Sequence, residues 1–273
     1  MGKFTGCLLA CDIDGTLMES GYINEKNIKA IEHFMNEGGY FAIATGRSVT
    51  AISDVTNTLL RISPSVVANG CMIYDYENEI ILHQELLPKS DYCFAKEVLD
   101  SGLNVGIEVH TGKRIFTLNK TAKTDLHQKY QSLETMVISY EEVVSYDWNK
   151  VLFTCDEEED FEKLKQLSKK YDKTSRIILT GLYLDGEHQK FLEQIPLGVS
   201  KATAIRRLCE MFNIKKGYSY AIGDFYNDIE MLENADISAT VAGAPDEIKQ
   251  MVDFVSCECC DGAVSDFIDY LKD

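Results

Sequence analysis

The feature that most constrains the fold is a repeated alternation of short apolar runs and helical patterns near both ends of the chain. The apolar runs are typical of strands buried on both faces, and they cover residues 6–12, 40–45, 65–70, 218–224 and 236–243. Segments with apolar residues at helical spacing follow these runs, at residues 24–39, 48–60, 200–214, 226–235 and 244–252. Buried strands that alternate with helices form parallel sheets covered on both faces. The sequence therefore predicts an α/β fold with a doubly wound, mostly parallel sheet.

The middle of the chain follows a different pattern. Residues 71–86 have the pattern of a β-hairpin with Asn78 at the turn. From about Leu86 to Gln189, further strand patterns surround two or three helices, including one at residues 157–171. This arrangement predicts an α+β insertion between the two halves of the doubly wound domain.

Charge and cysteine content narrow the classes of function. The chain has 44 acidic and 27 basic residues, for a net charge of -17, which repels nucleic-acid backbones and anionic membranes. A small phosphorylated ligand is still possible, because a local cation can dominate one pocket. Nine scattered cysteines indicate a reduced protein. The start "MGKFTG" lacks the layout of a secretion signal, and no apolar run reaches the ~20 residues of a membrane span. We therefore expect a cytoplasmic protein that binds neither nucleic acid nor membranes.

Polar residues follow the predicted core strands at the points where these strands end. Asp12 and Asp14 lie one residue apart after the first strand, Thr45 and Gly46 follow the second, and Asp224 ends a strand near the C-terminus. Ligands of open parallel sheets bind at this edge, so these residues should converge. Each has a simpler explanation when taken alone, as an Asp-Gly turn or a strand-to-helix turn. Their convergence favours a functional site.

Four motifs carry a resemblance to a known family. "DIDGTL", "ATGR", "GVSKATAI" and "GDFYND", in this order, resemble the motifs of the haloacid dehalogenase-like hydrolases. The similarity is greatest to the Cof-type (IIB) phosphatase branch, and it extends to "ANG" at residues 68–70 and "GAPDEIK" at residues 243–249. The resemblance implies a catalytic core at residues 1–85 and 190–273 and a C2B-like cap at residues 86–189 that covers the active site.

The resemblance also implies the chemistry. Asp12 would be the nucleophile that forms an aspartyl-phosphate, and Asp14 would be the general acid and base. Mg²⁺ would be held by the Asp12 carboxylate, the Asp14 backbone carbonyl and the Asp224 carboxylate, which are the hard oxygen ligands it prefers. The cation would offset the repulsion between the neighbouring carboxylates.

Other motif residues would bind or support the substrate phosphate. By resemblance, the phosphate-binding residues are Thr45, Gly46, Lys201 and Asn227, although Asn227 would alternatively orient Lys201. Asp228 would support Lys201 and the metal-bound waters, and Arg47 would either touch substrate or pack the loop. Taken alone, Lys201 would be read as a solvated residue at the start of a helix. Gly243 stands where the family often has Asn, so we expect an accessory hydrogen bond at the rim of the site to be missing.

Asp14 discriminates between the activities of the family. Ion-pumping ATPases of this fold have Thr at this position, and dehalogenases lack the second aspartate. A mutase needs a basic cluster in the cap, whereas the basic residues between Leu86 and Gln189 are spread out. We therefore expect a phosphatase of small phosphomonoesters, such as sugar phosphates, acting as a monomer or a weakly associated homodimer. The alternatives are a phosphosugar mutase and a non-catalytic sugar-phosphate-binding regulator.

Overall fold

The computed structural model describes residues 2–184 and 187–272, without the side chains of residues 182–188. The chain divides into two compact units. The first, called the core unit here, contains the residues up to Gly46, Ser53–His83 and the residues from Ser200 onward. The second unit contains Arg47–Ile52 and Gln84–Val199. In the described ranges, no helix is long and apolar enough to cross a membrane.

The core unit is built on a parallel sheet with the strand order β16-β15-β14-β1-β4. Its strands are β1 (Leu8–Cys11), β4 (Tyr40–Ile43), β14 (Ser219–Ile222), β15 (Ile237–Thr240) and β16 (Phe254–Val255). Leu8 of the central strand β1 pairs with Ser219 of β14 and with Tyr40 of β4. Because the three strands start in register, their carboxyl ends lie together at one edge of the sheet.

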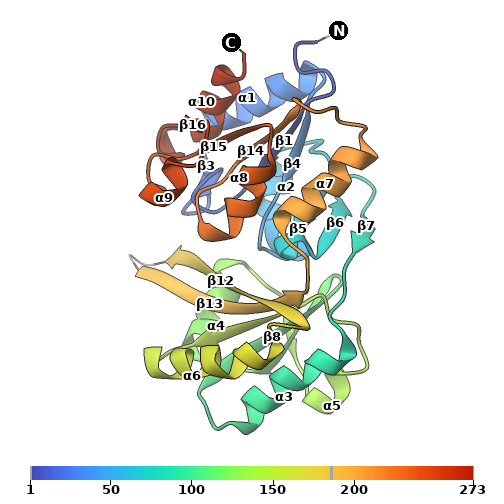
Figure 1. Cartoon of the computed structure of the whole chain (residues 1–273), viewed down its shortest axis with the longest axis vertical. Helices are drawn as coiled ribbons and strands as arrows, with labels where there is room; N and C mark the ends of the chain where they lie inside the picture. The colour runs from blue at the N-terminus through green and yellow to red at the C-terminus, as the bar shows by residue number, and fades with distance from the viewer. Residues whose placement is uncertain (1, 185–186, 273) are drawn as a thin grey trace. The chain divides into compact units, whose positions relative to one another are not determined.

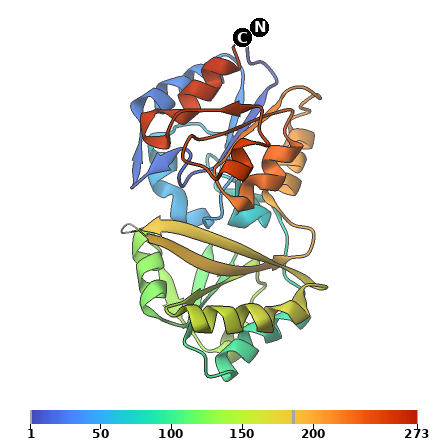
Figure 2. The same ribbon diagram turned by 60° about the vertical axis from the view of Figure 1, so that its left-hand side comes forward.

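Helices cover both faces of this sheet (Figure 1). They are α1 (Glu25–Asn36), α2 (Ser53–Thr58), α7 (Lys201–Met211), α8 (Ile229–Asn234), α9 (Asp246–Lys249) and α10 (Ala263–Tyr270). Leu8 and Ala10 of β1 pack in one cluster with Leu208 of α7 and Met231 of α8. Figure 2 shows α1 and α10 side by side. The predicted doubly wound α/β class is confirmed.

Two smaller sheets complete the core unit. One contains β5 (Ser65–Val67), β6 (Met72–Asp75) and β7 (Ile80–Gln84), and the other pairs β2 (Met18–Glu19) with β3 (Tyr22–Ile23). The hairpin expected at residues 71–86 is therefore present, and Asn78 lies in its turn. The apolar run at residues 65–70 differs from expectation, because the strand ends at Val67 and residues 68–70 form a tight helical turn.

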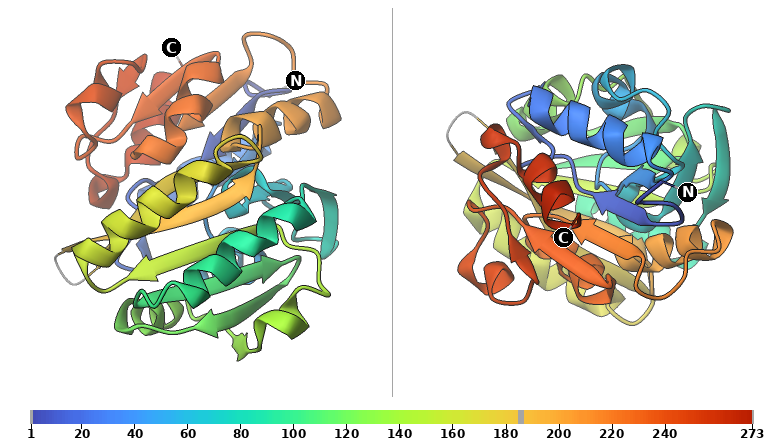
Figure 3. Two further views of the ribbon diagram at one scale, coloured as in Figure 1. Left: turned by 60° about the horizontal axis from the view of Figure 1, so that its bottom comes forward. Right: turned by 90° about the horizontal axis from the view of Figure 1, so that it is seen from above.

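The second unit contains a six-stranded sheet in the order β10-β9-β8-β11-β13-β12. The strands are β8 (Val105–Thr111), β9 (Arg114–Asn119), β10 (Thr135–Val137), β11 (Lys150–Cys155), β12 (Ser175–Leu184) and β13 (Glu187–Pro196). The helices are α3 (Cys93–Asp100), α4 (Ala122–Tyr130), α5 (Tyr140–Val143) and α6 (Glu158–Ser168). Figure 3 shows α3 and α6 side by side across one face of the sheet. This is the inserted α+β architecture.

The two faces of this sheet differ in chemistry. On one face, Val109 and Phe153 belong to an apolar cluster with residues of α3 and α6. The alternate positions of the same strands carry buried polar side chains: Glu108, His110, Lys150, Thr154 and Glu193. The strand period of two therefore separates an apolar face from a face that we call the polar face.

The boundary expected between residues 189 and 190 differs from that in the structure, where the second unit extends to Val199. The cause is β13, which continues to Pro196 and pairs with both β11 and β12. Its apolar residues pack in this sheet rather than starting a core strand. Arg47–Ile52 also groups with the second unit rather than with the core.

Candidate active site

The predicted site residues follow three adjacent strands of the core unit. Asp12 comes directly after β1, and its backbone N–H donates to the carbonyl of Ile222 in β14 at 3.0 Å. One residue separates Thr45 from the end of β4, and one residue separates Asp224 from the end of β14. Because β1 lies between β14 and β4, the structure brings these segments together as the sequence predicts.

Lys201 lies at the centre of the site. It is the first residue of α7, whose N-terminus is capped by the Ser200 side chain. Its Nζ donates to Asp12 Oδ1 and to Asp228 Oδ1, both at 2.6 Å, and the residue is only 1% exposed. The reading of Lys201 as a solvated residue beyond a helix cap is therefore excluded. A buried lysine with two carboxylate partners is held in one position.

Three carboxylates form a cluster around this lysine. One oxygen each from Asp12, Asp224 and Asp228 lies within 4.8 Å of the other two. Asp224 Oδ1 accepts a hydrogen bond from the Thr16 hydroxyl at 2.9 Å. Gly15 has φ +82, and a β-carbon there would lie 2.5 Å from Asp224 Oδ2, so the "DGT" turn fits this carboxylate only with glycine.

The charges of the cluster are not balanced within it. Burial raises the pKa of Asp12 to about 7; Lys201 opposes this effect, whereas Asp228 and Asp14 add to it. Burial and the charges of Asp12 and Asp228 raise the pKa of Asp224 well above its usual range. Burial alone would lower the pKa of Lys201, but the two carboxylates outweigh it and raise that pKa. One ammonium therefore faces several carboxylates, an excess of negative charge that a cation would offset.

The donor set fits a hard divalent cation, which the carboxylates of Asp12 and Asp224 could hold. Asp228 is less suited to this role, because Lys201 occupies its Oδ1 and the N–H groups of Asp224 and Phe225 donate to its Oδ2 at 3.2 Å. Asp228 instead fixes the lysine and the turn after β14. Oxygen-only donors of this kind suit Mg²⁺.

The remaining predicted residues occupy neighbouring loops. The backbone N–H of Thr45 donates to the Val66 carbonyl at 2.9 Å, which fixes the loop that carries Gly46. Asn227 Nδ2 donates to Asn69 Oδ1 at 3.2 Å. Asp14 is half-buried beside the cluster, near enough for its charge to act on Asp12.

Arg47 belongs to the second unit. Its Nη1 donates to the Ala51 carbonyl at 3.1 Å, and its guanidinium carbon lies 5.8 Å from the centroid of the Tyr130 ring. These contacts pack the loop after Gly46, which is one of the two roles expected for Arg47. A contact with substrate stays a prediction.

Two residues of the site were not singled out in the sequence. Thr16 lies in the first motif, and its contact with Asp224 was not anticipated. Asn69 lies in the "ANG" segment, which carried a resemblance but no assigned role. Their contact partners are distant in the chain, so the spacing of residues could not reveal these roles. The only indication in the sequence was that each residue lies within a motif of the family.

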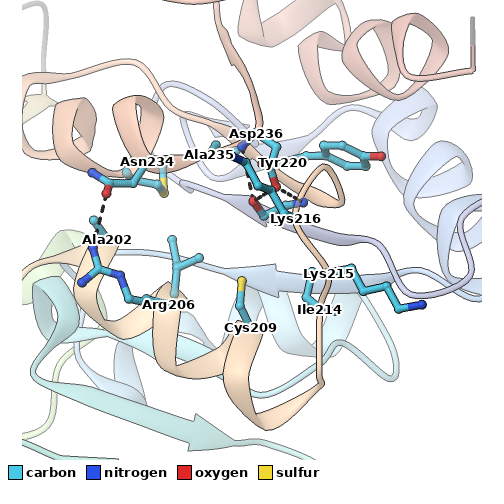
Figure 4. Close-up of a pocket in the computed structure, with 14 residues that line it drawn as sticks. Ala202, Arg206, Cys209, Ile214, Lys215, Lys216, Tyr220, Asn234, Ala235 and Asp236 are labelled. Atoms are coloured by element: carbon cyan, nitrogen blue, oxygen red, sulfur yellow. Dashed lines mark hydrogen bonds between the residues drawn. The ribbon is translucent and has the colours of Figure 1, made fainter.

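A separate pocket lies between α7, α8 and β14 (Figure 4). Its volume is about 190 Å³, and its lining includes Arg206, Cys209, Tyr220 and Asp236. Arg206 donates to Asn234 Oδ1 at 3.3 Å. No residue of the carboxylate cluster lines this pocket. It is therefore distinct from the candidate active site.

Comparison with known proteins identifies the family of this chain. Residues 9–268 match the family of haloacid dehalogenase-like hydrolases. The chain belongs to this family, as its four motifs indicated. The solved structure of a haloacid dehalogenase-like hydrolase from Bacteroides thetaiotaomicron superposes with a TM-score of 0.84 at 21% identity, covering 98% of this chain and 100% of that one. A sugar phosphatase of subclass IIB gives a TM-score of 0.82 at 20% identity, with 97% and 98% covered. The fold is thus that of the IIB branch.

Curated relatives of similar length are named as phosphatases. Phosphatase YwpJ of Bacillus subtilis is 27% identical, over 91% of this chain and 94% of the relative. The phosphatase YcsE of the same organism, named for 5-amino-6-(5-phospho-D-ribitylamino)uracil, is 25% identical, over 91% and 89%. The expected class of enzyme, a phosphoric monoester hydrolase, is confirmed by the family and these relatives.

Proposed function

We propose that this protein is a Mg²⁺-dependent phosphatase that hydrolyses small phosphomonoesters, such as sugar phosphates, through an aspartyl-phosphate. The observation that carries the proposal is the buried Asp12, which Lys201 holds beside the carboxylate of Asp224. A buried nucleophile fixed by a cation is suited to attack on an anionic ester. A non-catalytic regulator could lose the nucleophile or the general acid, whereas this chain has both Asp12 and Asp14.

The reaction proceeds in two steps. An oxygen of Asp12 attacks phosphorus and the bond to the ester oxygen breaks, while Asp14 gives a proton to the departing alkoxide. Asp14 then takes a proton from water, whose oxygen attacks the phosphorus of the aspartyl-phosphate. The Asp12 carboxylate is regenerated and inorganic phosphate is released. Asp14 is half-buried, which suits a group that exchanges protons with substrate and water.

Four groups would hold the transferred phosphoryl group. The Thr45 hydroxyl and the Gly46 N–H donate from the loop after β4, and Asn227 donates from the loop after β14. Lys201 adds a positive charge at the N-terminus of α7, where the helix dipole also favours an anion. These donors act on charge that develops at the phosphoryl oxygens in the transition state.

The cation would be held by the carboxylates of Asp12 and Asp224 and by the backbone carbonyl of Asp14. When bound, Mg²⁺ would offset the carboxylate charges and withdraw charge from the phosphoryl oxygens. Asp228 and Thr16 then act as orienting residues, since Asp228 fixes Lys201 and Thr16 fixes Asp224.

If the site binds Mg²⁺, the metal should change the thermal stability of the protein as well as its activity. Mg²⁺ at about tenfold above its Kd is expected to raise the Tm of the native protein by roughly 3–6 °C. Asp224→Asn should lose this shift, because one ligand carboxylate is gone, and turnover should fall with it. Calorimetry with and without a chelator measures the first effect, and phosphate release measures the second.

The matched control is Asp246→Asn in α9, since the Asp246 side chain is 89% exposed. This variant should keep the full Mg²⁺ shift. An equal shift in the Asp224 and Asp246 variants, or undiminished turnover in excess chelator, would contradict the assigned metal site.

The proposed activity is tested by a panel of phosphorylated metabolites. Purified protein with Mg²⁺ should release phosphate from several small esters and from a generic aryl phosphate. A phosphosugar mutase would instead isomerise a sugar monophosphate when primed with a sugar bisphosphate. A regulator would bind the ester without turnover.

We further propose that the second unit is the cap and that its polar face selects the leaving group. His110 is 4% exposed, and neither ring nitrogen has a hydrogen-bond partner among the described residues. Burial lowers the pKa of His110 well below its usual range, and Lys150 and His127 add to this effect. A neutral imidazole can donate and accept one hydrogen bond each, which matches the hydroxyl groups of a sugar.

His110→Gln is therefore expected to change substrate preference more than catalysis. We expect kcat/KM for sugar phosphates to fall about tenfold or more relative to an aryl phosphate, which has no hydroxyl groups to bind. His33→Gln, at an exposed position of α1, is the matched control. Equal losses for every substrate would indicate damage to the fold and count against the assigned role.

A further inference from the structure

The turn that follows β5 has an unusual backbone. Ala68 and Asn69 have φ values of 52 and 55, and Gly70 has φ 100. Consecutive non-glycine residues in the left-handed region are strained, and such strain persists only where the surroundings impose it. Asn is among the residues that tolerate this conformation, whereas Ala is not. The turn is buried, with Asn69 only 2% exposed.

This turn contacts three separate loops of the active site. The backbone N–H of Asn69 donates to the Thr45 carbonyl at 3.0 Å. A β-carbon on Gly46 would lie 3.1 Å from both amide atoms of Asn69, so the side chain lies directly against this glycine. The Asn69 Oδ1 accepts a hydrogen bond from Asn227 Nδ2 at 3.2 Å. One side chain thus joins the loop after β4 to the loop after β14.

Gly70 provides the third contact. A β-carbon at this position would lie 2.1 Å from the Ser200 carbonyl oxygen and 3.0 Å from the Lys201 nitrogen. Only glycine permits this approach, which places the turn against the first residue of α7. Each residue that would bind the phosphoryl oxygens therefore adjoins residues 68–70 through its backbone or side chain.

We propose that Asn69 is a positioning residue that sets the spacing between Gly46 and Asn227 for phosphate binding. The inference rests on the proposed function, because these two residues act there as phosphate donors. Asn69 does not touch the phosphoryl group in this role. Its left-handed backbone presents the amide to Gly46, and its Oδ1 orients the Asn227 amide so that the other N–H is available to the anion.

Asn69→Gly is the informative substitution, because glycine keeps the left-handed backbone and removes only the amide. We expect a fall in kcat/KM of about tenfold, mainly through KM, and a similar rise in the inhibition constant for inorganic phosphate. Asn213→Gly is the matched control, since Asn213 is exposed and also has a positive φ of 54. It should behave as the native protein does in both measurements.

A double-mutant cycle separates positioning from general loosening. If Asn69 acts through Asn227, Asn69→Gly should lower kcat/KM only slightly in an enzyme that already carries Asn227→Ala. If the two substitutions lower kcat/KM independently, so that their effects multiply in the double variant, the proposal is overturned. An Asn69→Gly enzyme with the native KM and native inhibition by phosphate would overturn it as well. A native protein that hydrolyses no phosphate ester would instead overturn the proposed function.

A second variant covers the case in which Asn69→Gly fails to fold. Asn69→Asp keeps the left-handed preference and the acceptor for Asn227, but it places a negative charge against Gly46. Inhibition by inorganic phosphate should then weaken by more than tenfold. Unchanged inhibition in this variant would show that the Asn69 side chain does not lie against the phosphate-binding Gly46 and would overturn the proposal.

Discussion

Replacement of Asp12 by Asn is expected to abolish turnover of every phosphate ester, by on the order of 10⁴-fold or more. The amide cannot attack phosphorus as the carboxylate does, so no phosphoenzyme forms. The fold should persist, because the amide oxygen can still accept the hydrogen bond that Lys201 donates to Asp12 Oδ1. Steady-state phosphate release measures the loss of turnover. The mass of the intact protein after an acid quench shows whether a phosphoenzyme has formed.

The loss should be the same for sugar and aryl phosphates, because the nucleophile acts on phosphorus whatever the leaving group is. Asp269→Asn in α10 is the control, since the Asp269 side chain is 64% exposed and pairs with the neighbouring Lys272 at 2.6 Å. Measurable phosphoenzyme in the Asp12 variant would show that another residue is the nucleophile.

Much of the core and its site could be predicted because the sequence patterns that indicate them span only a few consecutive residues. Each of Asp12, Thr45 and Asp224 follows a short buried run. The rule that ligands bind at the carboxyl ends of parallel strands then brings them together without any knowledge of side-chain contacts. The strand order β14-β1-β4 supplies the adjacency that this reasoning requires.

The boundary of the second unit could not be predicted in the same way. The segment around Phe191 mixes polar and apolar residues in a pattern that does not identify the sheet it joins. Its pairing with β11 and β12 depends on contacts with residues 151–154 and 175–184. Hydrophobic periodicity contains no information about such partners.

Buried polar contacts were also invisible in the sequence. His110 and His127 are too far apart for a ligand spacing, yet β8 and α4 bring both to Glu108, with His127 Nδ1 3.0 Å from its Oε2. Likewise, the left-handed backbone of Asn69 follows a run that reads as a strand. Strain of this kind is imposed by neighbours from elsewhere in the chain.

Replacement of Asp14 by Asn is expected to separate the two chemical steps. The variant keeps Asp12 and every backbone group, and it loses proton transfer, which typically contributes ~10²–10⁴-fold in rate. A sugar alkoxide is a poor leaving group that needs a proton, so phosphorylation of Asp12 by a sugar phosphate should itself become slow. A nitrophenolate leaves without protonation, so this substrate should still phosphorylate the enzyme.

The phosphorylated variant should then stall, because no base remains to activate the hydrolytic water. Rapid mixing with nitrophenyl phosphate should show a burst of nitrophenol near one equivalent per enzyme, followed by a slow steady rate. The native enzyme should show no such burst if dephosphorylation is fast. A burst in the Asp12→Asn enzyme and none in the Asp14→Asn enzyme would reverse the two roles, because the residue needed for the first step is the one whose loss removes the burst.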